Sequence, residues 1–212
     1  MKKVIQGLLI VGSIVLAYYV YSTIQNPIDF STEQAKRYAA TTESLKNIRK
    51  AEMAFRDVNG RFTASWDTLG NFVKTGTLPL VKKIGSLSDE QLEAGMTEKE
   101  AISKGLIIRD TVRVSVRDSL YSKSYNVDRL RYIPFTKDEV FFLGINMITT
   151  GSGVKVPVFE GRAHNTQILA ELQDRYKQEI INLNEKRRLD GKYPGLKVGS
   201  LTETNNSAGN WE

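Results

Sequence analysis

The pattern of hydrophobic and polar positions changes twice along the chain, and its first section is almost entirely apolar. No residue from Val4 to Ile24 carries a charge. As a helix this run of about 21 residues rises roughly 31 Å, enough to cross a hydrocarbon layer of ~30 Å. Tyr18, Tyr19 and Tyr21 lie near its end, and tyrosine side chains suit the headgroup layer of a bilayer. The pattern therefore predicts a transmembrane helix over residues 4–24.

The charges on either side of this run predict its orientation. Lys2 and Lys3 precede it, and the next Lys or Arg is Lys36. Because positive residues favour the cytoplasmic side, we expect a bacterial inner-membrane protein with a cytoplasmic stub (residues 1–3) and a periplasmic bulk. The alternative is a cleaved secretory signal. The run is longer than the ~7–15 residues of a signal core, and no small-x-small cleavage site follows, so a retained signal-anchor is favoured.

The second section has the period of an amphipathic helix. Pro27 predicts a break or kink just beyond the membrane, and Ser31 with Gln34 resembles a capping box at a new helix start. Steps of three and four to Val58 predict one apolar stripe, with Arg37 on the opposite, polar face. Asn59-Gly60 predicts a turn. Ser65 and Gly76 then bound a short helix.

In the third section the period becomes two. Alternation predicts strands over 106–120, 130–136, 139–149 and 154–163, and further extended segments over 77–85 and 196–203. Another helix is predicted over 165–190, and short charged helices over 88–95 and 97–105. We therefore expect an α+β fold over residues 28–202, in which the transmembrane helix continues into a long amphipathic helix packed on an antiparallel sheet of about four strands, plus a C-terminal helix. Residues 203–212 are expected to be a polar tail.

Composition narrows the chemistry. The net charge is +6, from 30 Lys and Arg against 24 Asp and Glu, but the signs alternate along the chain, which is typical of a solvated surface and not of a nucleic-acid footprint. Cysteine is absent and His164 is the single histidine. Since general bases and zinc ligands are mostly His or Cys, we expect no enzyme activity, no metal, no cofactor and no nucleic-acid partner. His164 precedes a predicted helix, where we expect a cap or a surface residue.

Three small groups are candidates for contacts. Ser13 and Ala17 are four residues apart, with Gly12 beside them, and small residues at this spacing allow a second helix to approach; such residues are also common in membrane helices generally. Arg109, Arg113 and Arg117 alternate along one predicted strand face. They would bind an anionic wall polymer or a partner's acidic patch, or simply discourage edge pairing. Tyr193 and Pro194 form either a contact loop or a helix stop.

The region after the long helix resembles type IV pilins and pseudopilins. In that family an apolar helix continues into an amphipathic one, followed by an Asn-Gly turn with an aromatic, a short helix with a buried Leu, and an antiparallel sheet. The matching positions are Phe55, Asn59, Gly60, Phe62, Trp66 and Leu69. Pro27 lies near the family's kinking proline. The chain departs from the family in having no Glu in its apolar helix and no leader ending in Gly before a Phe. The resemblance therefore implies the architecture and not filament assembly.

These observations favour one function over another. We expect a non-enzymatic, single-pass, membrane-anchored structural or accessory subunit of a bacterial envelope assembly, such as a secretion, pilus-like or energy-transducing complex. Its partners would be the lipid bilayer and other envelope membrane proteins, or further copies of itself. The alternative is an extracytoplasmic ligand-sensing or cell-wall-binding module that uses the arginine-bearing strand.

Overall fold

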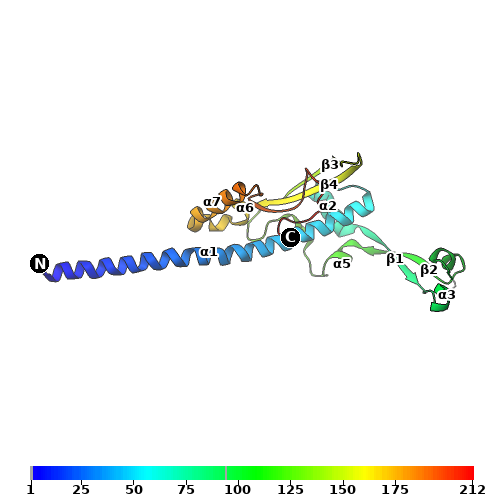
Figure 1. Ribbon diagram of the computed structural model, residues 1–212, viewed down its shortest axis with the longest axis horizontal. Coiled ribbons are helices and arrows are strands. Elements are labelled where there is room, and N and C mark those ends of the chain that lie inside the picture. Colours follow the sequence, from blue (N-terminus) through cyan, green and yellow to red (C-terminus); the bar gives the residue numbers. More distant parts are fainter. Residues whose placement is uncertain (1, 94) are drawn as a thin grey trace. The chain divides into compact units, whose positions relative to one another are not determined.

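A single long helix begins the chain. The computed structural model describes residues 2–93 and 95–212, with the side chains of residues 81–83, 92, 109 and 110 outside the description. Helix α1 runs from Lys2 to Asn59 and contains Pro27 (Figure 1). The expected helix start at Ser31 and a break at Pro27 are therefore wrong, whereas a kink at Pro27 stays a prediction. A proline removes one backbone N–H, and side-chain hydrogen bonds link neighbouring turns here, from Gln25 to Asp29 at 2.8 Å and from Asn26 to Ser22 at 3.0 Å.

The chain divides into two compact units, and α1 contributes to both. The first unit comprises the chain up to Arg49 together with Arg129–Glu212, and the second comprises Lys50–Asp128. Mixed helix and sheet occur in both units, so the expected α+β class is confirmed at this level.

The first unit packs α1 on a three-stranded antiparallel sheet. The sheet consists of β3 (Phe142–Thr149), β4 (Lys155–His164) and β5 (Gly195–Gly199) in the order β3-β4-β5. A Cβ on Gly161 would lie 3.6 Å from Ile48 and 3.7 Å from Leu45, so glycine lets the centre of β4 approach α1 closely. Helices α6 (Asn165–Ile168) and α7 (Gln173–Leu189), with the short 3₁₀ helix η2 (Ala170–Leu172) between them, follow β4. The long helix predicted over 165–190 is thus divided.

The second unit is built on the end of α1 and on α2. It contains α2 (Trp66–Thr75), β1 (Thr77–Ile84), α3 (Asp89–Glu93), α4 (Glu98–Ser103), β2 (Ile108–Ser115) and α5 (Val116–Leu120). The caps expected for α2 are confirmed, because the Ser65 side chain accepts from the Thr68 N–H and Gly76 ends the helix. Leu69 and Val73 are fully buried, and the Phe55 and Phe72 rings meet edge to face at 5.1 Å.

The described strands form two sheets and not one sheet of about four strands. β1 pairs with β2 alone, from Thr77 opposite Ser115 to Ile84 opposite Ile108. The strand expected over 130–136 is wrong. That region instead begins within the 3₁₀ helix η1 (Val127–Arg131) and makes one isolated bridge, between Tyr132 and Val140. Pro134 cannot donate to a strand ladder, and Phe135 has a φ of 60°, which is incompatible with an extended strand.

Candidate functional site

The first part of α1 exposes a continuous apolar surface. From Val4 to Ile28 the large apolar side chains are between 53% and 72% exposed. Of the helices in the described chain, α1 is the one long and apolar enough to cross a membrane, and none of its apolar window is buried. By length and composition it is compatible with a membrane anchor or a signal sequence. An apolar surface of this extent, on all sides of a helix, is unfavourable in water.

The small residues of this segment lie on an open part of the helix. Apart from the two neighbouring residues and the backbone of the helix itself, no described atom lies within 4 Å of the position that a Cβ on Gly12 would take. The Ser13 hydroxyl donates to the Leu9 carbonyl at 2.9 Å, so its hydrogen bond is satisfied within the helix. Gly12, Ser13 and Ala17 thus remain a predicted contact for a second helix.

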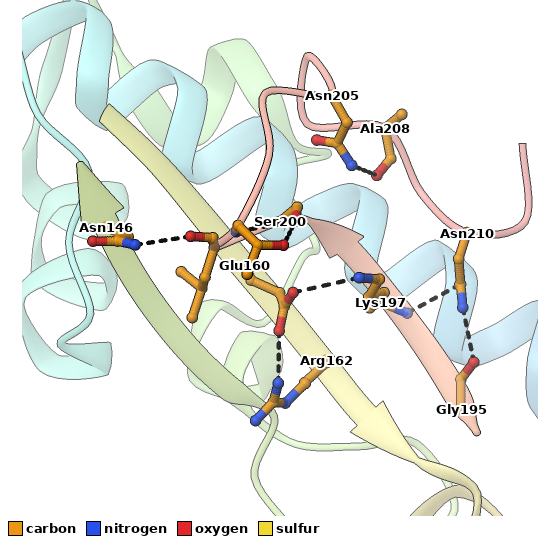
Figure 2. A network of polar contacts seen from close by, with 11 residues as sticks. Asn146, Glu160, Arg162, Gly195, Lys197, Ser200, Asn205, Ala208 and Asn210 are labelled. Atoms are coloured by element: carbon orange, nitrogen blue, oxygen red, sulfur yellow. Dashed lines mark hydrogen bonds and ion pairs between the residues drawn. The ribbon is translucent and has the colours of Figure 1, made fainter. Parts of the chain in front are cut away.

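The sheet of the first unit carries a nearly buried carboxylate on β4. The side chain of Glu160 is 6% exposed and lies between two cations, with Arg162 Nη1 at 2.8 Å and Lys197 Nζ at 3.6 Å (Figure 2). In the strand register Arg162 stands opposite Phe142 on one side and Lys197 on the other. The Arg162 guanidinium lies 4.1 Å from the centre of the Phe142 ring and 5.7 Å from that of Tyr193. The one carboxylate is thus shared by two cations, and these three side chains carry one excess positive charge.

The structure places the predicted loop Tyr193-Pro194 against this cluster. Tyr193 is half-buried, and burial raises the pKa of its hydroxyl. Its ring meets His164 edge-on at 6.1 Å, and the Pro194 carbonyl accepts from the Asn165 N–H at 3.0 Å. These contacts fix the loop to the start of α6, and they leave its role as a contact loop or as a helix stop open.

His164 caps helix α6, which is one of the two roles that we expected for it. Its Nδ1 accepts from the Thr166 N–H at 3.2 Å, and the Gln167 side chain accepts from the His164 N–H at 3.1 Å. Burial, followed by the charge of Arg188, lowers the pKa of this imidazole, which suits a ring nitrogen that must remain an acceptor. Among residues 2–93 and 95–212, no three His, Asp or Glu side chains are grouped so as to hold a metal ion.

The polar tail expected at 203–212 lies along β5. The N–H of Asn210 donates to the Lys197 carbonyl at 3.0 Å, its side-chain oxygen accepts from the Lys197 N–H at 3.1 Å, and its amide donates to Gly195 (Figure 2). On α1, Arg49 donates to the Ser207 carbonyl at 3.2 Å and pairs with Glu212 at 2.7 Å. We call residues 200–212 the C-terminal strap. Sequence reasoning missed its docking, although Trp211 in a polar tail was a signal.

The three arginines predicted to share a strand face are not all on one strand. Arg113 lies exposed on β2, whereas Arg117 lies in α5; the side chain of Arg109 is outside the described residues. The Ser115 side chain accepts from the Asp118 N–H at 3.4 Å and begins this helix. A Ser followed three residues later by an acid is a helix-start signal. Here the chain forms a helix from Val116, although the alternation of apolar and polar residues predicted that the strand would continue.

Two charged side chains of α1 are buried, which the sequence interpretation did not anticipate. Arg37, expected on the polar face, is 7% exposed; it pairs with Glu171 at 2.9 Å and lies 5.1 Å from the Phe135 ring. Glu52 is fully buried, and its Oε2 accepts from the Thr63 N–H at 3.2 Å. Burial raises the pKa of Glu52 to about 8. Both residues lie at helical spacing from the core residues Leu45 and Ile48, a signal that was present in the sequence.

Comparison with known proteins adds no relative: no family model, no curated protein and no solved structure matches this chain.

Proposed function

We propose that this chain is a single-pass membrane protein that holds a folded α+β region at a bacterial membrane. It would act without catalysis, as a structural or accessory subunit of an envelope assembly. One observation carries the proposal: α1 is exposed and apolar from Val4 to Ile28, and the same unbroken helix supplies the core residues Leu45 and Ile48. A helix of this kind joins anchor and folded region without a flexible linker.

The pilin-like architecture belongs to this proposal. A long helix, apolar first and amphipathic later, packs against an antiparallel sheet in the first unit. The Asn59-Gly60 turn, with Gly60 at a φ of 71°, precedes the short helix α2 with its buried Leu69. These features support the resemblance at the level of architecture. The partners that we propose are the bilayer and other envelope membrane proteins or further copies of the chain, with Gly12, Ser13 and Ala17 at the contact between helices.

Membrane retention is tested on the full chain in its native membrane. We expect the protein to remain in the pellet after alkaline carbonate extraction, and mass spectrometry to find its amino-terminal peptide intact. A variant that lacks residues 4–24 is the control and should appear in the soluble fraction. Recovery of the wild-type protein in solution as a shortened chain that begins near residue 26 would contradict the anchor and indicate a cleaved signal.

Orientation is tested with single cysteines, because the chain contains none. Ser152→Cys, in the turn between β3 and β4, should react with a membrane-impermeant maleimide from the periplasmic side. Lys3→Cys should react only after the inner membrane is permeabilised. The opposite labelling pattern would reverse the proposed topology without affecting the anchor.

Membership of an assembly is tested by a pull-down in mild detergent. Stoichiometric envelope proteins should accompany the wild-type chain. Ala17→Leu, which fills the small-residue face, should lose partners that contact the membrane helix, whereas Val11→Ala on the opposite face should retain them. Recovery of the chain alone and monomeric would contradict the role as a subunit.

A further inference from the structure

A cavity of about 480 Å³ lies within the second unit and is lined mainly by polar and charged side chains. Its walls come from the last turn of α2, from α5, from the loop that follows α5 and from the start of η1. The lining includes Lys74, Arg117, Ser124, Tyr125, Asn126 and Asp128. This volume is in the range of small-ligand sites, which bury most of a ligand against a few well-placed polar groups.

Arg117 is a cation with few partners at this cavity. Its Nη2 donates to the Lys123 carbonyl at 3.0 Å. Its Nε is shielded from solvent and has no hydrogen-bond partner among the described residues. No described carboxylate lies within 4.0 Å of the guanidinium. Because a guanidinium has five N–H donors and keeps its charge, this half-buried group lacks the anion that would balance it.

The other charges at the cavity leave it positive. Lys74 Nζ pairs with Asp128 Oδ1 at 2.5 Å, and the Asn126 side-chain oxygen accepts from the Asp128 N–H at 3.0 Å. The one carboxylate in the lining is therefore engaged, and the lining as a whole carries one excess positive charge. Asn126 has an amide that can donate, and Ser124 a hydroxyl. A donor-rich, positive site selects a ligand that offers acceptors and negative charge.

The lining of the cavity includes one aromatic side chain, Tyr125. Its ring stacks on Tyr121, with centres 4.4 Å apart and planes within 10°. An aromatic ring held in this way offers an apolar surface to a planar amide or to the apolar side of a sugar ring. The lining thus combines charged groups with an aromatic one.

We propose that this cavity binds a carboxylate-bearing ligand, with the carboxylate at the guanidinium of Arg117 and the remainder of the ligand against Tyr125. The carboxylate supplies the ion pair that Arg117 lacks. Acidic peptides and uronic-acid polymers share this chemistry. The inference does not depend on the membrane anchor, and it assigns binding to Arg117 and not to Arg113, which is exposed on β2.

The test uses the full-length protein in detergent and two probes. N-acetyl-L-glutamate represents an acidic peptide and D-glucuronate an acidic sugar; N-acetyl-L-glutamine amide and D-glucose are their uncharged counterparts. In NMR titrations, at least one acid should change the backbone amide chemical shifts in a saturable way. The changes should centre on residues 117–128. The uncharged counterparts should cause none. Whichever acid binds more tightly identifies the source of the carboxylate.

Two variants of equal charge change make the test specific. Arg117→Gln should weaken binding at least tenfold, which corresponds to about 1.4 kcal/mol. Arg113→Gln removes the same charge from the exposed face of β2 and should leave binding within about twofold. If Arg117→Gln unfolds in a thermal melt, Arg117→Lys and the location of the shifts in the wild type take its place. The proposal is overturned if neither acid binds saturably, if the shifts centre elsewhere, or if both arginine variants behave alike.

Discussion

Two regions of the same helix differ in what surrounds them. Residues Val4–Ile24 of α1 are apolar on every side and exposed, whereas Thr41, Leu45 and Ile48 form a buried stripe whose flanks are polar. Both regions have the same backbone and belong to one uninterrupted helix. The comparison teaches that the distribution of side chains around the axis, and not helix formation itself, separates a segment compatible with a membrane anchor or a signal sequence from a surface that packs in a protein core.

The largest expected difference between the regions is in packing. Ile48→Ala should lower the free energy of unfolding by about 2–5 kcal/mol, because it leaves a cavity in a filled core. Ile14→Ala, the same change in the exposed region, should alter it by less than about 0.5 kcal/mol. Chemical denaturation in detergent measures both. Equal losses would mean that the exposed region is packed against protein.

An introduced charge should be costly in the apolar region and tolerated beyond it. Val11→Arg places a guanidinium at the centre of the proposed membrane helix, where insertion is expected to cost about 2.5–3.5 kcal/mol. Thr32→Arg places the same group beyond the apolar run and should be tolerated. The readout is the fraction of protein that resists carbonate extraction. Full retention of Val11→Arg would weaken the assignment of a membrane-spanning segment.

The buried carboxyl of Glu52 should make stability depend on pH. The folded chain keeps this proton up to about pH 8, whereas an ordinary Glu releases it near 4.5. Between these values the folded state binds more protons, so the free energy of unfolding should fall as pH rises, by about 1.4 kcal/mol per pH unit. Urea melts across this window measure the slope. Glu52→Gln should remove it, and Glu43→Gln, at the exposed ion pair with Lys46, should not.

The smallest expected effect concerns the C-terminal strap. Arg49→Ala removes the exposed pair with Glu212 and one bond to the Ser207 carbonyl, and should cost about 1 kcal/mol or less. The strap should nevertheless exchange its amide hydrogens faster, which hydrogen–deuterium exchange over residues 200–212 measures. Lys50→Ala, an exposed lysine of the same helix, is the control on α1. A loss much above 1 kcal/mol would show that the strap supports the core.

Elements with local signals were predictable from the sequence. Ser65 and Gly76 bound α2 as expected, and Thr97 with Glu100 forms the capping box of α4. The alternation over 139–149 and 154–163 predicted β3 and β4 to within a few residues. These elements were predictable because the side chains that specify them act within one turn or one strand.

Features that depend on distant partners were not predictable. No local pattern indicates that β1 and β2 pair only with each other, since strand partners are chosen by the whole fold. The burial of Arg37 depends on Glu171 and Phe135, which lie about a hundred residues or more further along the chain. Among the candidate sites, Arg117 was identified from its charge, but its cavity is completed by Lys74 and the loop after α5. Spacing along one strand could not reveal that arrangement.

Because α1 is continuous through Pro27, it also fixes the rotation of the first unit about the helix axis relative to the apolar segment. Successive residues of a helix are rotated by about 100° and displaced by about 1.5 Å along its axis. In the proposed membrane anchor, a continuous helix therefore sets which side of the first unit faces along the membrane plane. One residue inserted after Ile24 would swing that side by about 100°, whereas seven would return it to within ~20° and raise it by ~10 Å. Height above the membrane and direction of facing could thus be varied separately.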